Sequence, residues 1–179
     1  MSEGFCGCIQ NICNSIEYKG GVNSLGIQVV KKEELKVVGI CWNGTYLQTE
    51  TIPGLFSEME RRLNEISYKT ADPVIIAPFH SRETEFTYYV TTPVEQIHQV
   101  PNGMVGFTIP RKNYVVTSHF GPADEVEDTY QRLFTWMKEY GYEQDHQALS
   151  LEIYQQHSHG QDLSKNLLFE IYIPVKTYN

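Results

Sequence analysis

Two glutamates in apolar segments are the side chains most suited to chemistry in this sequence. Residues 149–154 read "LSLEIY", and their strict alternation puts Glu152 and Tyr154 on one face of a predicted strand. A second segment, "LLFEIYIPV", repeats the same spacing with Glu170 and Tyr172. A carboxylate beside a phenol in apolar surroundings can receive a cation or act as a general base. The same alternation is also typical of the solvated face of an antiparallel sheet, so both interpretations stay open.

The elements around these segments follow one order, written twice. The order is strand, helix, strand, strand. The predicted helices are amphipathic, and the second has the apolar stripe Val126, Tyr130, Leu133, Met137 and Tyr140. The first copy comprises a strand at 29–40, a helix over about 51–66, and strands at 73–80 and 85–95; the second comprises a strand at 113–120, a helix after Gly121-Pro122, and strands at 148–156 and 166–175.

The two copies also end alike, in "FTYYVTTPV" and "FEIYIPV". We therefore predict an α+β fold in which duplicated βαββ units form a largely antiparallel sheet with two main helices. Two related halves leave a seam between them, and such seams are preferred places for small-molecule pockets. We expect a central ligand cleft there.

Composition narrows the classes of partner. The chain has 179 residues, 41% of them hydrophobic, and a net charge of −8, which argues against direct binding of nucleic acid. It contains no apolar run long enough for a membrane span and no secretion signal, so we expect a cytoplasmic protein with no membrane partner. Cys6, Cys8 and Cys13 lie in an irregular N-terminal arm and lack the paired spacing of a zinc site.

No cofactor or metal motif is found. The "HSHG" segment at 157–160 is typical of a solvated turn, and the remaining histidines are too scattered to define a catalytic order. Glycine-rich phosphate loops are also missing from the sequence. We expect no cofactor and no metal ion.

The order and spacing of several segments resemble the GyrI-like effector-binding domains. The segments are "TIPGLFSEM", "IPRKNYVVTSHFGP", "DTYQRLFTWM" and "LSLEIY". These domains are the ligand-sensing part of many bacterial multidrug and AraC-type transcription regulators, and they also occur as stand-alone proteins. The resemblance implies an arm over 1–28 and one domain over 29–179, with halves at about 29–97 and 103–178.

The resemblance also implies a site. The family's acidic pocket residue falls on Glu152, which would receive the positive charge of a lipophilic cation at the bottom of an aromatic pocket. Tyr154, Tyr172, Tyr89 and Glu170 would line that pocket, although Glu170 is as well explained by a solvated face. Further candidates for the wall of the pocket are large aromatic residues near strand ends or the second helix: Trp42, Tyr46, Phe120 and Trp136. For Trp136, a place in the core is the alternative.

Three functions follow from these expectations. The first is a module that binds small hydrophobic cations and either sequesters them or reports them to a partner regulator. We do not expect direct DNA binding, because the residues before the domain are too few and too irregular for a helix-turn-helix unit. The second is a hydrolase of reactive natural products with Glu152 as general base. The third is an acidic interaction protein, since founding members of the family inhibit DNA gyrase.

Overall fold

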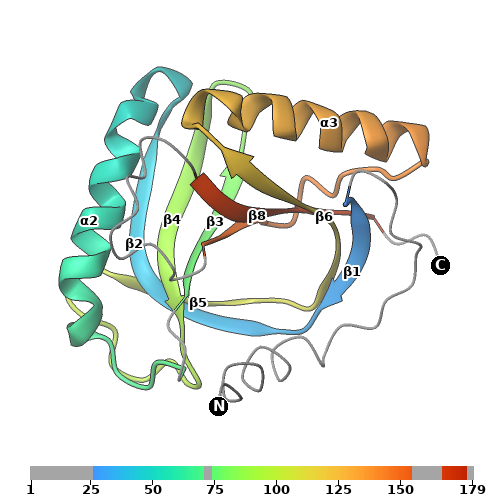
Figure 1. The fold of residues 1–179 in the computed structure, drawn as a ribbon. Helices are drawn as coiled ribbons and strands as arrows, with labels where there is room; N and C mark the ends of the chain where they lie inside the picture. Colours follow the sequence, from blue (N-terminus) through green and yellow to red (C-terminus); the bar gives the residue numbers. More distant parts are fainter. Residues whose placement is uncertain (1–25, 71–73, 155–166, 177–179) are drawn as a thin grey trace, which may run out of the picture.

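The computed structural model describes residues 26–70, 74–154 and 167–176 (Figure 1). The predictions for the arm cysteines and for the "HSHG" segment lie outside the described residues. No helix in the described part of the chain is long and apolar enough to cross a membrane. The elements are β1 (Gln28–Lys32), β2 (Leu35–Thr45), η1 (Tyr46–Thr51), α2 (Ile52–Arg62), η2 (Leu63–Glu65), β3 (Ile75–Ser81), β4 (Glu85–Pro93), β5 (Val105–Ile109), β6 (Lys112–Gly121), η3 (Ala123–Glu125), α3 (Val126–Glu139), β7 (Ser150–Tyr154) and β8 (Leu167–Pro174).

Most of these elements were predicted, with three differences. The strand expected at 29–40 is two strands, β1 and β2, separated by the charged turn between them. Strand β5 was not predicted, because its five residues carry too short an alternation to stand out. Tyr140, assigned above to the buried stripe of α3, is 60% exposed because α3 ends at Glu139.

The eight strands form one sheet in the order β1-β6-β8-β7-β3-β4-β2-β5. Every neighbouring pair is antiparallel. The two βαββ units meet where β3 pairs with β7, at the centre of the sheet. Each unit also receives an edge strand from the other half, because β1 pairs with β6 and β5 pairs with β2. The predicted α+β fold with a duplicated βαββ unit is confirmed.

Pairing registers show how the halves correspond. Pro93 pairs with β2 in the same way as Pro174 pairs with β6, so residues of β4 match residues of β8 that lie 81 positions later. Through these strands, Ala77 of β3 corresponds to Glu152 of β7. These two residues are also direct cross-strand partners. Glu152 therefore lies on the approximate two-fold axis of the molecule, and its counterpart is an alanine.

Apolar residues pack on both faces of the sheet. One cluster lies under α2 and includes Met59, Ala77 and Tyr88. A second lies under α3 and includes Leu133 and Ile171. The third cluster contains residues of strands and connections only, on the opposite face, which the curved sheet partly encloses (Figure 1). The two helices thus cover the face that carries Ala77, with one helix over each half.

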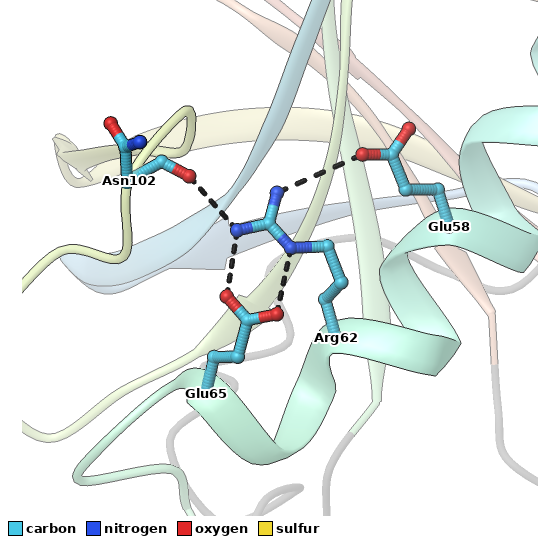
Figure 2. A network of polar contacts seen from close by, with 4 residues as sticks. All are labelled: Glu58, Arg62, Glu65 and Asn102. Carbon is cyan, nitrogen blue, oxygen red and sulfur yellow. Dashed lines mark hydrogen bonds and ion pairs between the residues drawn. The ribbon is translucent and has the colours of Figure 1, made fainter.

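A polar network anchors the C-terminal end of α2. The Arg62 guanidinium donates two hydrogen bonds to Glu65, of 2.9 and 2.7 Å, and one of 2.9 Å to the Asn102 carbonyl oxygen (Figure 2). Glu58 lies 3.7 Å from the same guanidinium. Asn102 belongs to the connection between β4 and β5, so Arg62 ties the end of α2 to a segment 40 residues away. This contact helps to hold α2 at its angle over the sheet.

Candidate ligand-binding site

Glu152 lies at the centre of the sheet and is only 8% exposed. Its cross-strand neighbours are Ala77 on β3 and Ile171 on β8. Both neighbours belong to the clusters beneath the helices, so the carboxylate points toward the space between α2 and α3. Burying a carboxylate in such apolar surroundings is costly unless it is paired or hydrogen-bonded.

Three tyrosine hydroxyls donate hydrogen bonds to this carboxylate. Tyr88 on β4 and Tyr154 on β7 donate to Oε2 at 2.5 and 2.8 Å. Tyr130 on α3 donates to Oε1 at 2.6 Å. All three distances are those of direct O–H···O hydrogen bonds. The site therefore draws on both halves of the molecule and on both a helix and the sheet.

Burial raises the pKa of the Tyr88, Tyr130 and Tyr154 phenols well above the usual value of 10.0, and the nearby charge of Glu152 raises it further. These phenols stay protonated and act as neutral donors at any ordinary pH. In the described part of the chain, no lysine, arginine or histidine pairs with Glu152. The negative charge is thus solvated by phenols but not neutralised by a cation.

Three phenylalanines pack against the tyrosines that bond the carboxylate. Matching Met59 with Leu133, the fully buried residue of each helix, makes Phe56 of α2 the counterpart of Tyr130. The strand registers make Phe79 the counterpart of Tyr154 and Phe169 the counterpart of Tyr88. Each tyrosine that binds Glu152 therefore has a phenylalanine at the equivalent position in the other half.

Ring contacts repeat with the same symmetry. Phe56 meets Tyr154 edge-on at 5.0 Å and 72°, and Phe79 meets Tyr130 edge-on at 6.4 Å and 74°. Phe79 stacks on Tyr88 at 6.2 Å, as Tyr154 stacks on Phe169 at 4.8 Å. These contacts link the six rings, here called the aromatic shell, into one continuous chain, and the three tyrosines of this chain bond the carboxylate.

Some residues predicted for the site lie in it or beside it. Tyr154 contacts Glu152 directly. Trp42 is the cross-strand partner of Tyr88 and packs edge-on against Phe86 at 5.2 Å, within the cluster under α2. Tyr46 is farther out: it is 47% exposed, and its ring stacks on Phe86 at 5.1 Å.

The second Glu-x-Tyr pair lies on the opposite face of the sheet. Glu152 pairs with Ile171, so the register places Glu170 and Tyr172 on the face without helices. There the Tyr172 hydroxyl donates to Glu170 at 2.8 Å. A register shift of one residue moves every side chain of a strand to the other face of the sheet. The Glu-x-Tyr spacing is the same in both segments, so it does not show that the two glutamates lie on opposite faces.

Three further predicted residues are not brought to the carboxylate. Tyr89 alternates with Tyr88 and packs at 4.9 Å against Phe107 instead. Phe120 is 72% exposed at the end of β6. Trp136 is buried and stacks on Tyr140 at 4.5 Å, which agrees with its alternative assignment to the core.

Sequence reasoning missed Tyr88 and Tyr130 as direct partners of Glu152. Tyr130 was placed in the apolar stripe of α3, and its hydroxyl was the signal that this stripe reaches a polar group. Tyr88 belongs to the run "TYYV", where either tyrosine could face the helices. Only the register of β4 against β2 and β3 distinguishes the two.

The described residues hold no group of three or more potential metal-binding side chains. A hollow of about 660 Å³ lies along α3, lined mainly by polar and charged residues such as Glu125, Asp128 and Arg132. These residues lie on the side of the helix away from Tyr130. This hollow is therefore separate from Glu152.

Comparison with known proteins identifies the family of the chain. The family model described as "GyrI-like small molecule binding domain" matches residues 26–176. The chain belongs to the GyrI-like family. This GyrI-like domain is 27% identical over 157 residues to the transcriptional regulator BrlR of Pseudomonas aeruginosa, covering 86% of the chain and 57% of BrlR.

Solved structures share the fold at low identity. SAV2435, solved with bound tetraphenylphosphonium, is 16% identical with a TM-score of 0.64, over 84% of this chain and 93% of that one. EcmrR, solved in a complex with DNA, is 16% identical with a TM-score of 0.68, over 85% of this chain and 57% of that one. The chain thus spans 57% of the length of BrlR and 57% of that of EcmrR.

Proposed function

We propose that this GyrI-like small-molecule-binding domain takes a hydrophobic monocation at Glu152. The observation that carries the proposal is one buried carboxylate, bonded to three phenols and paired with no cation among the described residues. The negative charge at the centre of the aromatic shell is a strong attraction for a ligand of opposite sign. Tetraphenylphosphonium bound to SAV2435 is a ligand of this kind.

The aromatic shell selects the class of cation. Ring faces attract a cation by about 0.5–2 kcal/mol each, and they also bury the apolar surface of the ligand. A metal ion such as Ca²⁺ is usually bound by several carboxylate and carbonyl oxygens. This site offers only one carboxylate, and its other oxygens belong to three neutral phenols. The rings pack around the carboxylate, so we propose that phenylalanine rings, which give it no hydrogen bond, move aside on binding, including Phe56 and Phe79.

We propose that ligand binding serves sensing or sequestration in the cytoplasm. A transcriptional regulator among the relatives favours sensing, with the response passed to a partner protein. EcmrR, which was solved in a complex with DNA, shares this fold, so the expectation that this chain does not bind nucleic acid directly stays a prediction. A role as a gyrase inhibitor has only the net charge in its favour. A role as a hydrolase has the composition of the site and a shared fold with a hydrolase from Listeria innocua, which is 12% identical with a TM-score of 0.52.

Titration with tetraphenylphosphonium and a rhodamine dye tests the proposal. We expect Glu152→Gln to weaken both ligands by about tenfold or more, because the amide keeps the shape but removes the charge. Glu170→Gln is the matched control, since it changes the other Glu-x-Tyr pair on the opposite face. Equal affinities in both variants would contradict the assignment. Mass spectrometry of the ligand after overnight incubation detects hydrolysis.

A further inference from the structure

We propose that the Glu152 site prefers cations without N–H groups, such as quaternary ammonium and phosphonium ions, over primary ammonium and guanidinium ions of the same charge. This inference rests on the proposed function and specifies its ligand. It follows from how the hydrogen-bonding capacity of the carboxylate is used.

The carboxylate has little capacity left. Two carboxylate oxygens offer about four acceptor positions in all. Tyr88 and Tyr154 occupy both positions on Oε2, and Tyr130 occupies one on Oε1. Within the described residues, one position on Oε1 therefore remains for a ligand.

A ligand with several N–H groups has more donors than the carboxylate has free acceptor positions. A primary ammonium ion has three N–H bonds to satisfy, and only one of them can reach a free position on the carboxylate. The others must displace a phenol, bond to the weaker neutral phenol oxygens, or stay unsatisfied in a buried site. A quaternary ion needs no acceptor, because the field of the carboxylate and the ring faces attract it without a hydrogen bond.

Tyr88 is held firmly as a donor, which makes its displacement costly. Tyr88 is 5% exposed, and its ring packs against Phe56, Phe79 and Phe86. A phenol that lost Glu152 as its acceptor would need another partner in an apolar environment. The phenol shell therefore acts as a filter on the chemistry of the ligand.

The variant Tyr154→Phe tests this filter. It keeps the aromatic ring and frees one acceptor position on Oε2. We expect it to improve binding of a primary ammonium ion relative to the quaternary ion. Tyr172→Phe is the matched control, because it removes a tyrosine–glutamate hydrogen bond of the same 2.8 Å length and sequence spacing on the opposite face.

The experiment compares naphthylmethyl-trimethylammonium with naphthylmethyl-ammonium by fluorescence titration of the full chain. In the wild type, we expect the quaternary ion to bind about tenfold or more tightly. Tyr154→Phe should narrow this ratio by about fivefold or more, and Tyr172→Phe should leave it unchanged. Tyr88→Phe, which frees a position on the same oxygen, replaces Tyr154→Phe if circular dichroism shows that the latter is unfolded.

Each result has one meaning. A ratio that narrows in Tyr154→Phe alone supports the filter. Binding that depends on Glu152, with the same ratio in the wild type and both tyrosine variants, would overturn the filter and leave the proposed function intact. Failure of both ions and of tetraphenylphosphonium to bind the wild type would overturn the proposed function as well.

Discussion

Single-residue alternation decides which side chains surround Glu152. Tyr88 faces the helices and bonds the carboxylate, while its neighbour Tyr89 faces away. Glu152 and Glu170 share the same local sequence, yet strand register puts them on opposite faces. Successive side chains of a strand point to opposite faces of the sheet, so the pairing register decides which of them face the helices. For Glu152, this register is that of the central pair β3 and β7.

Buried tyrosines give the first prediction at this scale, a loss of stability at high pH. Burial raises the pKa of Tyr114 to about 12 and that of Tyr88, Tyr130 and Tyr154 well above 10.0. Between pH 10 and 12 the unfolded chain releases phenolic protons that the folded chain keeps. The free energy of unfolding therefore falls as pH rises, by about 1.4 kcal/mol per pH unit for each such phenol.

Urea unfolding at several pH values above 9 measures this loss. Absorbance of phenolate at 295 nm should show these tyrosines ionising only as the protein unfolds. Tyr114→Phe is expected to reduce the slope of stability against pH in this range, because it removes one titrating group. Constant stability between pH 9 and 12 would contradict the burial of these phenols.

At the scale of elements, the site depends on how strands and helices are held against each other. Strand β2 pairs on both sides, with β4 and β5, and the backbone comes especially close at Gly39. A Cβ atom there would lie 2.1 Å from the Val90 carbonyl oxygen and 2.6 Å from the Thr91 Cα atom. Both are backbone atoms of β4, the strand that carries Tyr88, so they cannot move aside cheaply.

Gly39→Ala is therefore expected to destabilise the fold by about 2 kcal/mol or more, through strain between β2 and β4. Gly54→Ala is a matched control in the first turn of α2, where a Cβ atom would meet nothing within 4 Å. We expect that control to be neutral or to stabilise the fold by about 0.4–1 kcal/mol. Thermal and urea unfolding measure both changes, and equal stabilities would be evidence against the close approach.

At the scale of the whole molecule, the two halves are interlocked. Their contact includes the central β3–β7 pair and both exchanged edges, β1–β6 and β5–β2. Arg62 adds a contact between α2 and the connection before β5. Neither half contains all the strands that its part of the sheet needs, and neither contains the whole phenol shell, since Tyr88 lies in the first half and Tyr130 in the second.

This arrangement predicts fragment complementation. A cut between Gln99 and Val100 puts the two strands of each inter-half pair on different fragments. These pairs are β1–β6, β2–β5 and β3–β7. Each fragment alone is expected to be largely unfolded, because its edge strand and central strand lack partners. Mixed fragments should refold into a one-to-one complex that binds tetraphenylphosphonium, as measured by circular dichroism, size-exclusion chromatography and titration. A stable fold of either fragment alone would contradict the interlocked arrangement.

The sequence by itself determined most of the elements and their duplicated order, since these depend on local periodicity and on residue type, whereas the role of Glu152 follows from the family resemblance and stays a prediction. Only the tertiary structure decided which aromatic side chains meet that carboxylate. Tyr88 and Tyr130 come from two elements far apart in the chain, and their meeting at Glu152 depends on strand register and on the position of α3 over the sheet. A strand can shift its register by one residue while its sequence still alternates, and the shift exchanges the two faces. The alternation seen in the sequence therefore could not show whether Tyr88 or Tyr89 faces the helices.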